Sequence, residues 1–247
     1  MENENNVDGG TGVVSRLLSR LDNFWYHYKW HSIIALFLVF TVTICTLQMC
    51  DREKYDVNVL YAGGHVFARQ SEGADYPEYQ KILQSLKNFS EDYDEDGKVS
   101  VSLRDLYTPT EGELKEAEDS AFSSRAYEDR QILKSTMMSG EYFLCFFSPE
   151  VFENYDSVEG EGVGVFTPLS SLLPEGARVE FYNEKATAIK LSSLDVYELS
   201  GFSSLPENTV IAIRNTSFST HLDDDRNNRD YERSLEMLLK IVAYEAP

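Results

Sequence analysis

The hydrophobic pattern divides the chain into one long apolar run and a larger region of short alternating segments. The apolar run extends from Ser32 to Cys50 and contains no charged residue from Ser32 to Met49. A helix of about 18 residues spans about 27 Å, which is close to the thickness of a bilayer core. The aromatic sequence FWYHYKW at 24–30 is typical of a membrane–water interface. We therefore expect a transmembrane helix at 32–50.

The segment before this run, residues 1–31, is expected to be a disordered tail followed by a juxtamembrane aromatic segment. Arg16, Arg20 and Lys29 give it a slight basic excess, which predicts a cytoplasmic N-terminus and an extracytoplasmic C-terminal domain at the cell membrane. A cleaved signal peptide and a lipoprotein anchored through Cys50 are the alternatives. The charged region is long for a signal peptide, no Ala-x-Ala site follows, and the residue before Cys50 is not small, so an uncleaved single span is preferred.

Residues 51–247 begin with strand and helix patterns in alternation. Apolar or alternating strand patterns occupy 56–61, 98–107 and 142–147, and a helical spacing of apolar residues occupies 77–89. A further helical stretch at 111–138 separates the second and third strands. The resulting β-α-β-α-β order predicts parallel strands with right-handed crossovers.

The second half is less regular. Strands are expected at 179–182, 186–191 and 209–213, and a strongly amphipathic helix at 230–244. Thr110 and Glu113 match a capping box at the start of the middle helix. The sequence thus predicts an α/β protein: an N-terminal transmembrane helix followed by one extracytoplasmic three-layer domain, 51–247, with a mostly parallel or mixed sheet.

Composition narrows the function classes. Acidic residues number 42 against 22 basic ones, for a formal charge of −20, so nucleic acid is not an expected partner. Three cysteines do not make a disulfide framework in a chain of 247 residues. Cys145 lies inside an apolar strand pattern, where cysteine behaves as a small hydrophobic residue.

The order of elements resembles one lobe of the extracellular solute-binding proteins that serve ABC importers. The segments that carry this resemblance are DVNVLYAGG at 56–64, LKSTMMSGEYFLCFFSPEVFENY at 133–155 and LPENTVIAIRN at 205–215. The aromatic segment before a single span also resembles uncharacterised membrane-anchored proteins of Gram-positive bacteria. The resemblance implies a domain that binds a solute outside the cell.

A ligand site is expected just after the first strand, at Tyr61, Gly63, Gly64 and His65. In open α/β sheets, ligands bind beyond the carboxyl ends of the strands, and two glycines let the backbone approach a ligand closely. A plain turn is the alternative reading of this Gly-Gly pair, since the segment lacks a G-x-G-x-x-G pattern.

A structural calcium site is expected in the loop DYDEDGKVS. The oxygens would come from Asp92, Asp94, Asp96, the carbonyl of Lys98 and Ser100, which follow the spacing of a calcium loop. The loop lacks the bidentate glutamate at its twelfth position, and an acidic turn without metal is the alternative.

No residue set indicates a catalytic reaction. His221 stands beside three aspartates, a pattern that fits either a metal site or a solvated loop. We expect a non-enzymatic, membrane-tethered domain that binds a solute, a peptide or a partner membrane protein. The alternatives are a structural accessory subunit of a membrane complex and a surface hydrolase with paired acids.

Overall fold

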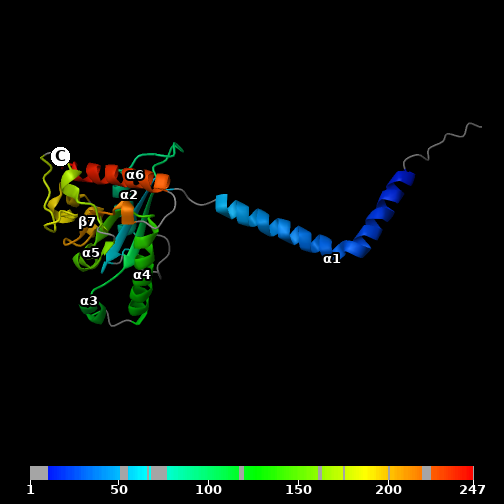
Figure 1. The fold of residues 1–247 in the computed structure, drawn as a ribbon, viewed down its shortest axis with the longest axis horizontal. Coiled ribbons are helices and arrows are strands. Elements are labelled where there is room, and N and C mark those ends of the chain that lie inside the picture. The colour runs from blue at the N-terminus through cyan, green and yellow to red at the C-terminus, as the bar shows by residue number, and fades with distance from the viewer. Residues whose placement is uncertain are drawn as a thin grey trace, which may run out of the picture. The chain divides into compact units, whose positions relative to one another are not determined.

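The computed structural model describes residues 11–50, 55–65, 67, 77–116, 120–160, 163–174, 176–199, 201–218 and 224–246 (Figure 1). The chain forms two compact units, 1–53 and 54–247. The α-helices are α1 Thr11–Cys50, α2 Pro77–Lys87, α3 Glu111–Glu116, α4 Ser120–Ser139, α5 Pro149–Asp156 and α6 Asp224–Val242. The strands are β1 Val57–Gly63, β2 Val101–Tyr107, β3 Leu144–Phe147, β4 Glu159–Gly160, β5 Val163–Gly164, β6 Ala188–Lys190 and β7 Val210–Ile213. Short 3-10 turns lie at Leu169–Ser171, Leu191–Ser193, Asp195–Glu198, Phe202–Ser204 and Thr216–Phe218.

Helix α1 contains the apolar run and is longer than the predicted span. It begins at Thr11, so residues 11–15, expected in a disordered tail, are helical; residues 1–10 lie outside the described part. Within it, Tyr28–Thr46 is long and apolar enough to cross a membrane, and no other described helix is. None of that window is buried, unlike a core helix of a soluble domain. The sequence and structure are therefore consistent with either a membrane anchor or a signal sequence.

The second unit is an α/β domain with a mixed sheet, as predicted. The five strands lie in the order β2-β1-β3-β7-β6. β2 and β3 are parallel to β1 on its two sides, whereas β7 is antiparallel to β3 and to β6. The expected strand at 179–182 contributes only an isolated bridge between Phe181 and Ile189. β4 and β5 form a separate two-stranded antiparallel ribbon.

Alternate residues of the central strands enter two hydrophobic clusters. Val59 and Tyr61 of β1 pack with apolar residues of α2 and α6, whereas Leu60 and Ala62 pack with apolar residues of α4 and α5. This alternation is what a strand buried on both faces requires. It explains the uninterrupted apolar sequence of β3, which is buried throughout. The parallel pairing of β1 with β3 places their carboxyl ends side by side.

Candidate functional site

The order of the parallel strands creates a crevice at one edge of the sheet. From β1 the chain passes through α2 to β2 on one side, and it later returns to β3 on the other side. The segments after β1 and β3 therefore diverge at the carboxyl edge. In doubly wound sheets this divergence is where ligands bind.

A cavity of about 270 Å³, here named the edge hollow, lies at this position. Its lining comes from the ends of β1 and β3, from the segment after β2 and from the turn before β7. The lining residues are Tyr61, Gly64, His65, Thr110, Glu113, Ser148, Pro149, Glu150, Pro206 and Asn208. Three of the four residues predicted as ligand contacts, Tyr61, Gly64 and His65, thus line one cavity. The fourth, Gly63, directly precedes Gly64 in the chain.

Steric crowding explains why glycine occupies positions 63 and 64. A Cβ atom on Gly63 would lie 2.6 Å from the Tyr61 hydroxyl oxygen, and a Cβ atom on Gly64 would lie 2.7 Å from both carboxylate oxygens of Glu113. Contacts this short require the neighbouring atoms to move. Gly63 and Gly64 therefore let a phenol and a carboxylate lie directly against the main chain, where they line or border the hollow.

Tyr61 is 1% exposed, and its hydroxyl accepts a hydrogen bond from the backbone N–H of His65 over 3.3 Å. Its ring meets the ring of Phe67 edge-on at 5.2 Å between centroids. Burial is the main reason that the pKa of this phenol is raised well above its usual range, and the charges of Asp105 and Glu113 add to the effect. The Tyr61 side chain is consequently a neutral hydroxyl at physiological pH.

His65 is half-buried beside the glycines. Its Nε2 lies 3.6 Å from Oε2 of Glu78, and its ring packs edge-on against Phe67 with centroids 4.7 Å apart. Burial lowers the pKa of the imidazole, and the carboxylate of Glu78 only partly opposes that shift. The imidazole is therefore predominantly neutral at pH 7 and above.

Glu113 reaches the hollow through the capping box predicted from the sequence. The backbone N–H of Thr110 donates to Oε2 of Glu113 over 2.7 Å, and the backbone N–H of Glu113 donates to Oγ1 of Thr110 over 3.1 Å. The reciprocal bonds confirm the capping box. They also fix the carboxylate above Gly64, a role in the hollow that the sequence motif alone does not indicate.

Sequence analysis did not identify Glu113, Ser148, Glu150 or Asn208 as site residues. A signal existed for Ser148, because it directly follows β3 and precedes Pro149 at the first position of α5. The rule that selected the residues after β1 applies equally to the residues after β3. Asn208 belongs to the turn before the antiparallel strand β7, and no local pattern places that turn at the carboxyl edge.

A second cavity, of about 370 Å³, adjoins the first and shares Glu150 with it. It lies between α4 and α5 and includes Arg130, whose Nη2 donates to the carbonyl of Pro109 over 2.7 Å. We place the candidate site in the edge hollow, since that cavity occupies the divergence point of the sheet and is lined by four separate segments of the chain.

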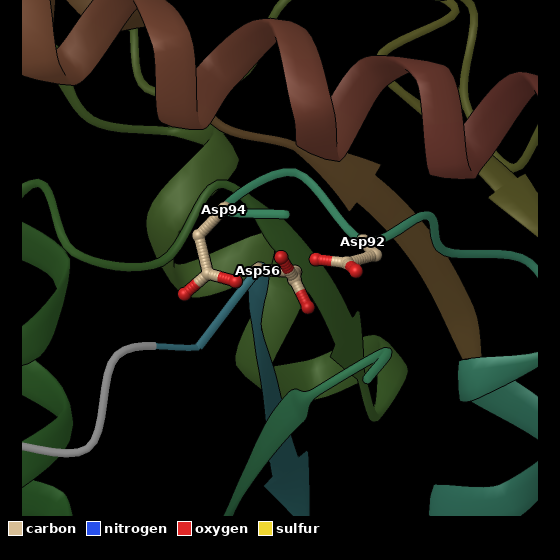
Figure 2. A group of neighbouring side chains, drawn as sticks. All are labelled: Asp56, Asp92 and Asp94. Carbon is tan, nitrogen blue, oxygen red and sulfur yellow. The ribbon is translucent and has the colours of Figure 1, made fainter. Parts of the chain in front are cut away.

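The predicted calcium loop brings acidic groups together with an additional partner. Carboxylate oxygens of Asp56, Asp92 and Asp94, named the acidic cluster, lie within 4.8 Å of one another (Figure 2). Asp92 and Asp94 were predicted as ligands, whereas Asp56, the residue before β1, was not. Carboxylate oxygens are the ligands that calcium prefers. These three residues could hold a cation.

Hydrogen bonds within the loop define its shape. Asp92 accepts from the backbone N–H of Gly97 over 2.7 Å, and Asp96 accepts from that of Lys98 over 2.8 Å. Gly97 has φ of 86°, as expected for a sharp turn at this position. Asp96 is outside the acidic cluster, and Ser100 donates its N–H to Oδ2 of Asp56 over 2.7 Å.

Asp56 also binds the other end of the loop. Its Oδ1 accepts from the backbone N–H of Tyr93 over 2.7 Å, and the Asp56 side chain is almost completely buried. The loop is further joined to α6, because the Tyr93 hydroxyl donates to Glu236 over 2.8 Å. The hydrogen bond from Lys240, and then that from Tyr93, lower the pKa of Glu236. The network ties the loop to the start of β1 and to α6.

Two further residues from the sequence analysis have clear outcomes. Cys145 is fully buried in β3, and burial raises the pKa of its thiol to about 12, so it is a core residue and not a reactive thiolate. His221 lies outside the described residues.

Comparisons of the chain with protein-family models, with curated proteins and with solved structures find no match.

Proposed function

We propose that this chain is a membrane-tethered, non-enzymatic binding protein whose extracytoplasmic domain, residues 51–247, holds a solute, a peptide or a segment of a partner protein in the edge hollow. The observation that carries the proposal is the cavity itself. It lies where the segments after β1 and β3 diverge, and its polar groups come from four separate parts of the chain.

The membrane part of the proposal rests on α1. Its window Tyr28–Thr46 is apolar and unburied, and the exposed aromatic residues Trp25, Tyr26 and Trp30 lie at or just before the window's start. Aromatic residues with a polar end favour the headgroup layer. We infer that α1 remains in the membrane as a single span, that residues before it are cytoplasmic, and that the helices packed on the two faces of the sheet make a three-layer domain outside the membrane.

The binding proposal is tested on the full chain in detergent micelles. Thermal unfolding is followed with a panel of sugars, amino acids, amines, organic acids and short peptides. A ligand at about 100 times its dissociation constant stabilises the folded state by about 2.7 kcal/mol, which is readily measured. We expect at least one solute to raise the melting temperature.

Two variants locate the binding site. His65→Ala changes a side chain of the edge hollow, whereas Asn154→Ala changes an exposed side chain that lines only the adjoining cavity. His65→Ala should weaken binding of the active solute by about tenfold or more, and Asn154→Ala should leave it unchanged. Equal effects, or an effect of Asn154→Ala alone, would place the site elsewhere. Turnover of the solute during the assay would favour the surface-hydrolase alternative.

A further inference from the structure

The edge hollow has an unbalanced set of charges. Among its described lining residues, Glu113 and Glu150 carry carboxylates, and no lining residue is a lysine or an arginine. Both carboxylates are on exposed residues at the rim. A third carboxylate, from Glu78, lies 3.6 Å from the imidazole of His65. The charged side chains that line or border the hollow are therefore predominantly acidic.

The carboxylate of Glu113 is held in place before any ligand arrives. One of its oxygens already accepts the Thr110 N–H at 2.7 Å, and the side chain lies against Gly64. A carboxylate has about four lone-pair sites, so Glu113 retains capacity to accept bonds from a ligand. A charge that is positioned in advance loses little conformational entropy on binding.

The other polar groups of the hollow are neutral. Burial keeps the Tyr61 phenol protonated and the His65 imidazole predominantly uncharged at pH 7. Ser148 and Asn208 contribute a hydroxyl and an amide. These groups suit a ligand with hydrogen-bonding capacity, but they do not offset the two carboxylates.

Charged groups around the hollow also favour a cationic ligand over an anionic one. Arg130 lies in the adjoining cavity and donates to a backbone carbonyl. Lys190 forms an ion pair with Glu180. The whole chain has a formal charge of −20, which raises the local concentration of cations and lowers that of anions. An anionic ligand would meet unfavourable charge both at a distance and in contact.

We propose that the edge hollow binds an organic cation that carries one or more ammonium groups, with Glu113 and Glu150 accepting from its N–H donors. This inference rests on the proposed function, because it assigns a ligand class to the same cavity. It predicts selectivity by charge between molecules of the same length and shape.

The test uses three four-carbon probes with the full chain in detergent: 1,4-diaminobutane, 1,4-butanediol and butanedioate. Binding is measured by isothermal titration calorimetry at pH 7.5, at low and at moderate salt. We expect the diamine to bind at least about tenfold more tightly than the diol, no binding of the dianion, and an affinity for the diamine that falls as salt rises.

Neutralising variants identify the residues. Glu113→Gln retains an oxygen able to complete the capping box. Glu150→Gln is the corresponding change in the first turn of α5. Glu128→Gln, at an exposed position of α4 away from the hollow, is the matched control. Each hollow variant should reduce diamine affinity by about tenfold or more, and the control should not change it. Circular dichroism melts confirm that the variants fold.

Other outcomes separate the two proposals. The diol or the dianion could bind as tightly as the diamine or more tightly. If His65→Ala also weakens that binding, the cation assignment is overturned while the binding function is supported. Diamine binding unaffected by both glutamate variants would also overturn it. Failure of every probe, together with failure of the wider solute and peptide panel, would overturn the proposed function itself.

Discussion

At the scale of single residues, close packing distinguishes a glycine that a side chain cannot replace from one that it can. Gly201 lies at a helical φ of −80°, so its backbone does not require glycine. A Cβ there would nevertheless lie 2.6 Å from the carbonyl oxygen of Lys81 and 2.2 Å from Oγ of Ser85. Gly112 lies in α3, and its Cβ would meet nothing closer than 3.7 Å.

Gly201→Ala should therefore destabilise the protein by about 1–3 kcal/mol, because the backbone of α2 must shift to make room. Gly112→Ala is the matched control and should stabilise by up to about 1 kcal/mol, since alanine has the better helix propensity. Denaturant unfolding of the full chain measures both. Equal changes in the two variants would contradict the packing argument.

Arg214 is the largest fully buried side chain, and its guanidinium nitrogens have no hydrogen-bond partner within the described residues. Its Cζ lies 5.4 Å from the centroid of the Phe143 ring. Burial lowers the pKa of the guanidinium below its usual range. A buried charge of this kind opposes folding.

Arg214→Met should raise the free energy of unfolding by about 1–4 kcal/mol, because methionine fills similar space without a desolvation penalty. Arg233→Met is the control: its guanidinium lies over Tyr93 at 4.9 Å in a partly buried position, so a change within about 1 kcal/mol is expected. Chemical denaturation compares the two. A loss of stability on Arg214→Met would indicate an uncharacterised partner for this charge.

His65 should give diamine binding a pH dependence. Its pKa is lowered mainly by burial, with Glu78 opposing, so the neutral imidazole is the favoured form in the fold. Protonation begins as the pH falls below the ordinary value of about 6.5, and it adds a positive charge next to an ammonium ligand. Affinity should be constant from pH 8 to about 6.5 and decline below it.

The measurement is calorimetric titration from pH 8 to about 5, above the range in which most carboxylates protonate. The decline should be absent in His65→Gln, whose side chain keeps a polar group without titrating. The same profile in wild type and variant would assign the decline to the glutamates.

At the scale of elements, the acidic loop shows which contacts a sequence motif predicts and which it does not. Asp92 and Asp94 were predicted as ligands from their spacing, and their carboxylates lie close together in the structure. Asp56 was not predicted to join the loop, because it is 36 positions before Asp92 and only the pairing of β1 with β2 brings the two together. A long-range contact of this type leaves no local pattern.

Calcium binding remains a prediction for this loop. Calcium should raise the melting temperature of the wild-type chain, and EGTA should reverse the effect, because a cation would relieve the repulsion within the acidic cluster. Asp94→Ala removes one carboxylate and should abolish the calcium-dependent shift. Glu232→Ala, at an exposed site on α6, should preserve it. An equal shift in wild type and Asp94→Ala would contradict the prediction.

The elements also show where sequence information ends. β1, β2, β3 and α2 follow from local periodicity and begin and end within a few residues of the predicted positions. The direction of β7 cannot be predicted from local periodicity, because an apolar run has the same pattern in a parallel and an antiparallel pair. The edge hollow depends on that direction, since the turn before β7 supplies Asn208. Three of the four lining segments follow parallel strands and were accessible from strand order, whereas the turn before β7 was not.

At the scale of the whole molecule, the proposed membrane location rests on the window Tyr28–Thr46. The double variant Phe37→Arg/Phe40→Arg adds two charges at its centre, each at a cost of about 2.5–3.5 kcal/mol on insertion scales. The double variant should be found in the soluble fraction or be degraded, whereas the wild-type protein should be found in the membrane fraction. Tyr26→Arg/Lys29→Arg, near the N-terminal end of the window, should remain in the membrane after carbonate extraction. Retention of both variants would contradict the anchor.

The capping box gives ligand occupancy a structural consequence. Glu113 serves two partners, because the carboxylate that lines the hollow is also the one that receives the Thr110 N–H. A ligand that draws this carboxylate inward competes with the first turn of α3, whereas a ligand that leaves the bond intact secures that turn. Binding and helix order are therefore thermodynamically linked, and each changes the other by the same free energy. Under the proposed function, the order of the six-residue helix α3 would report whether the cavity is filled.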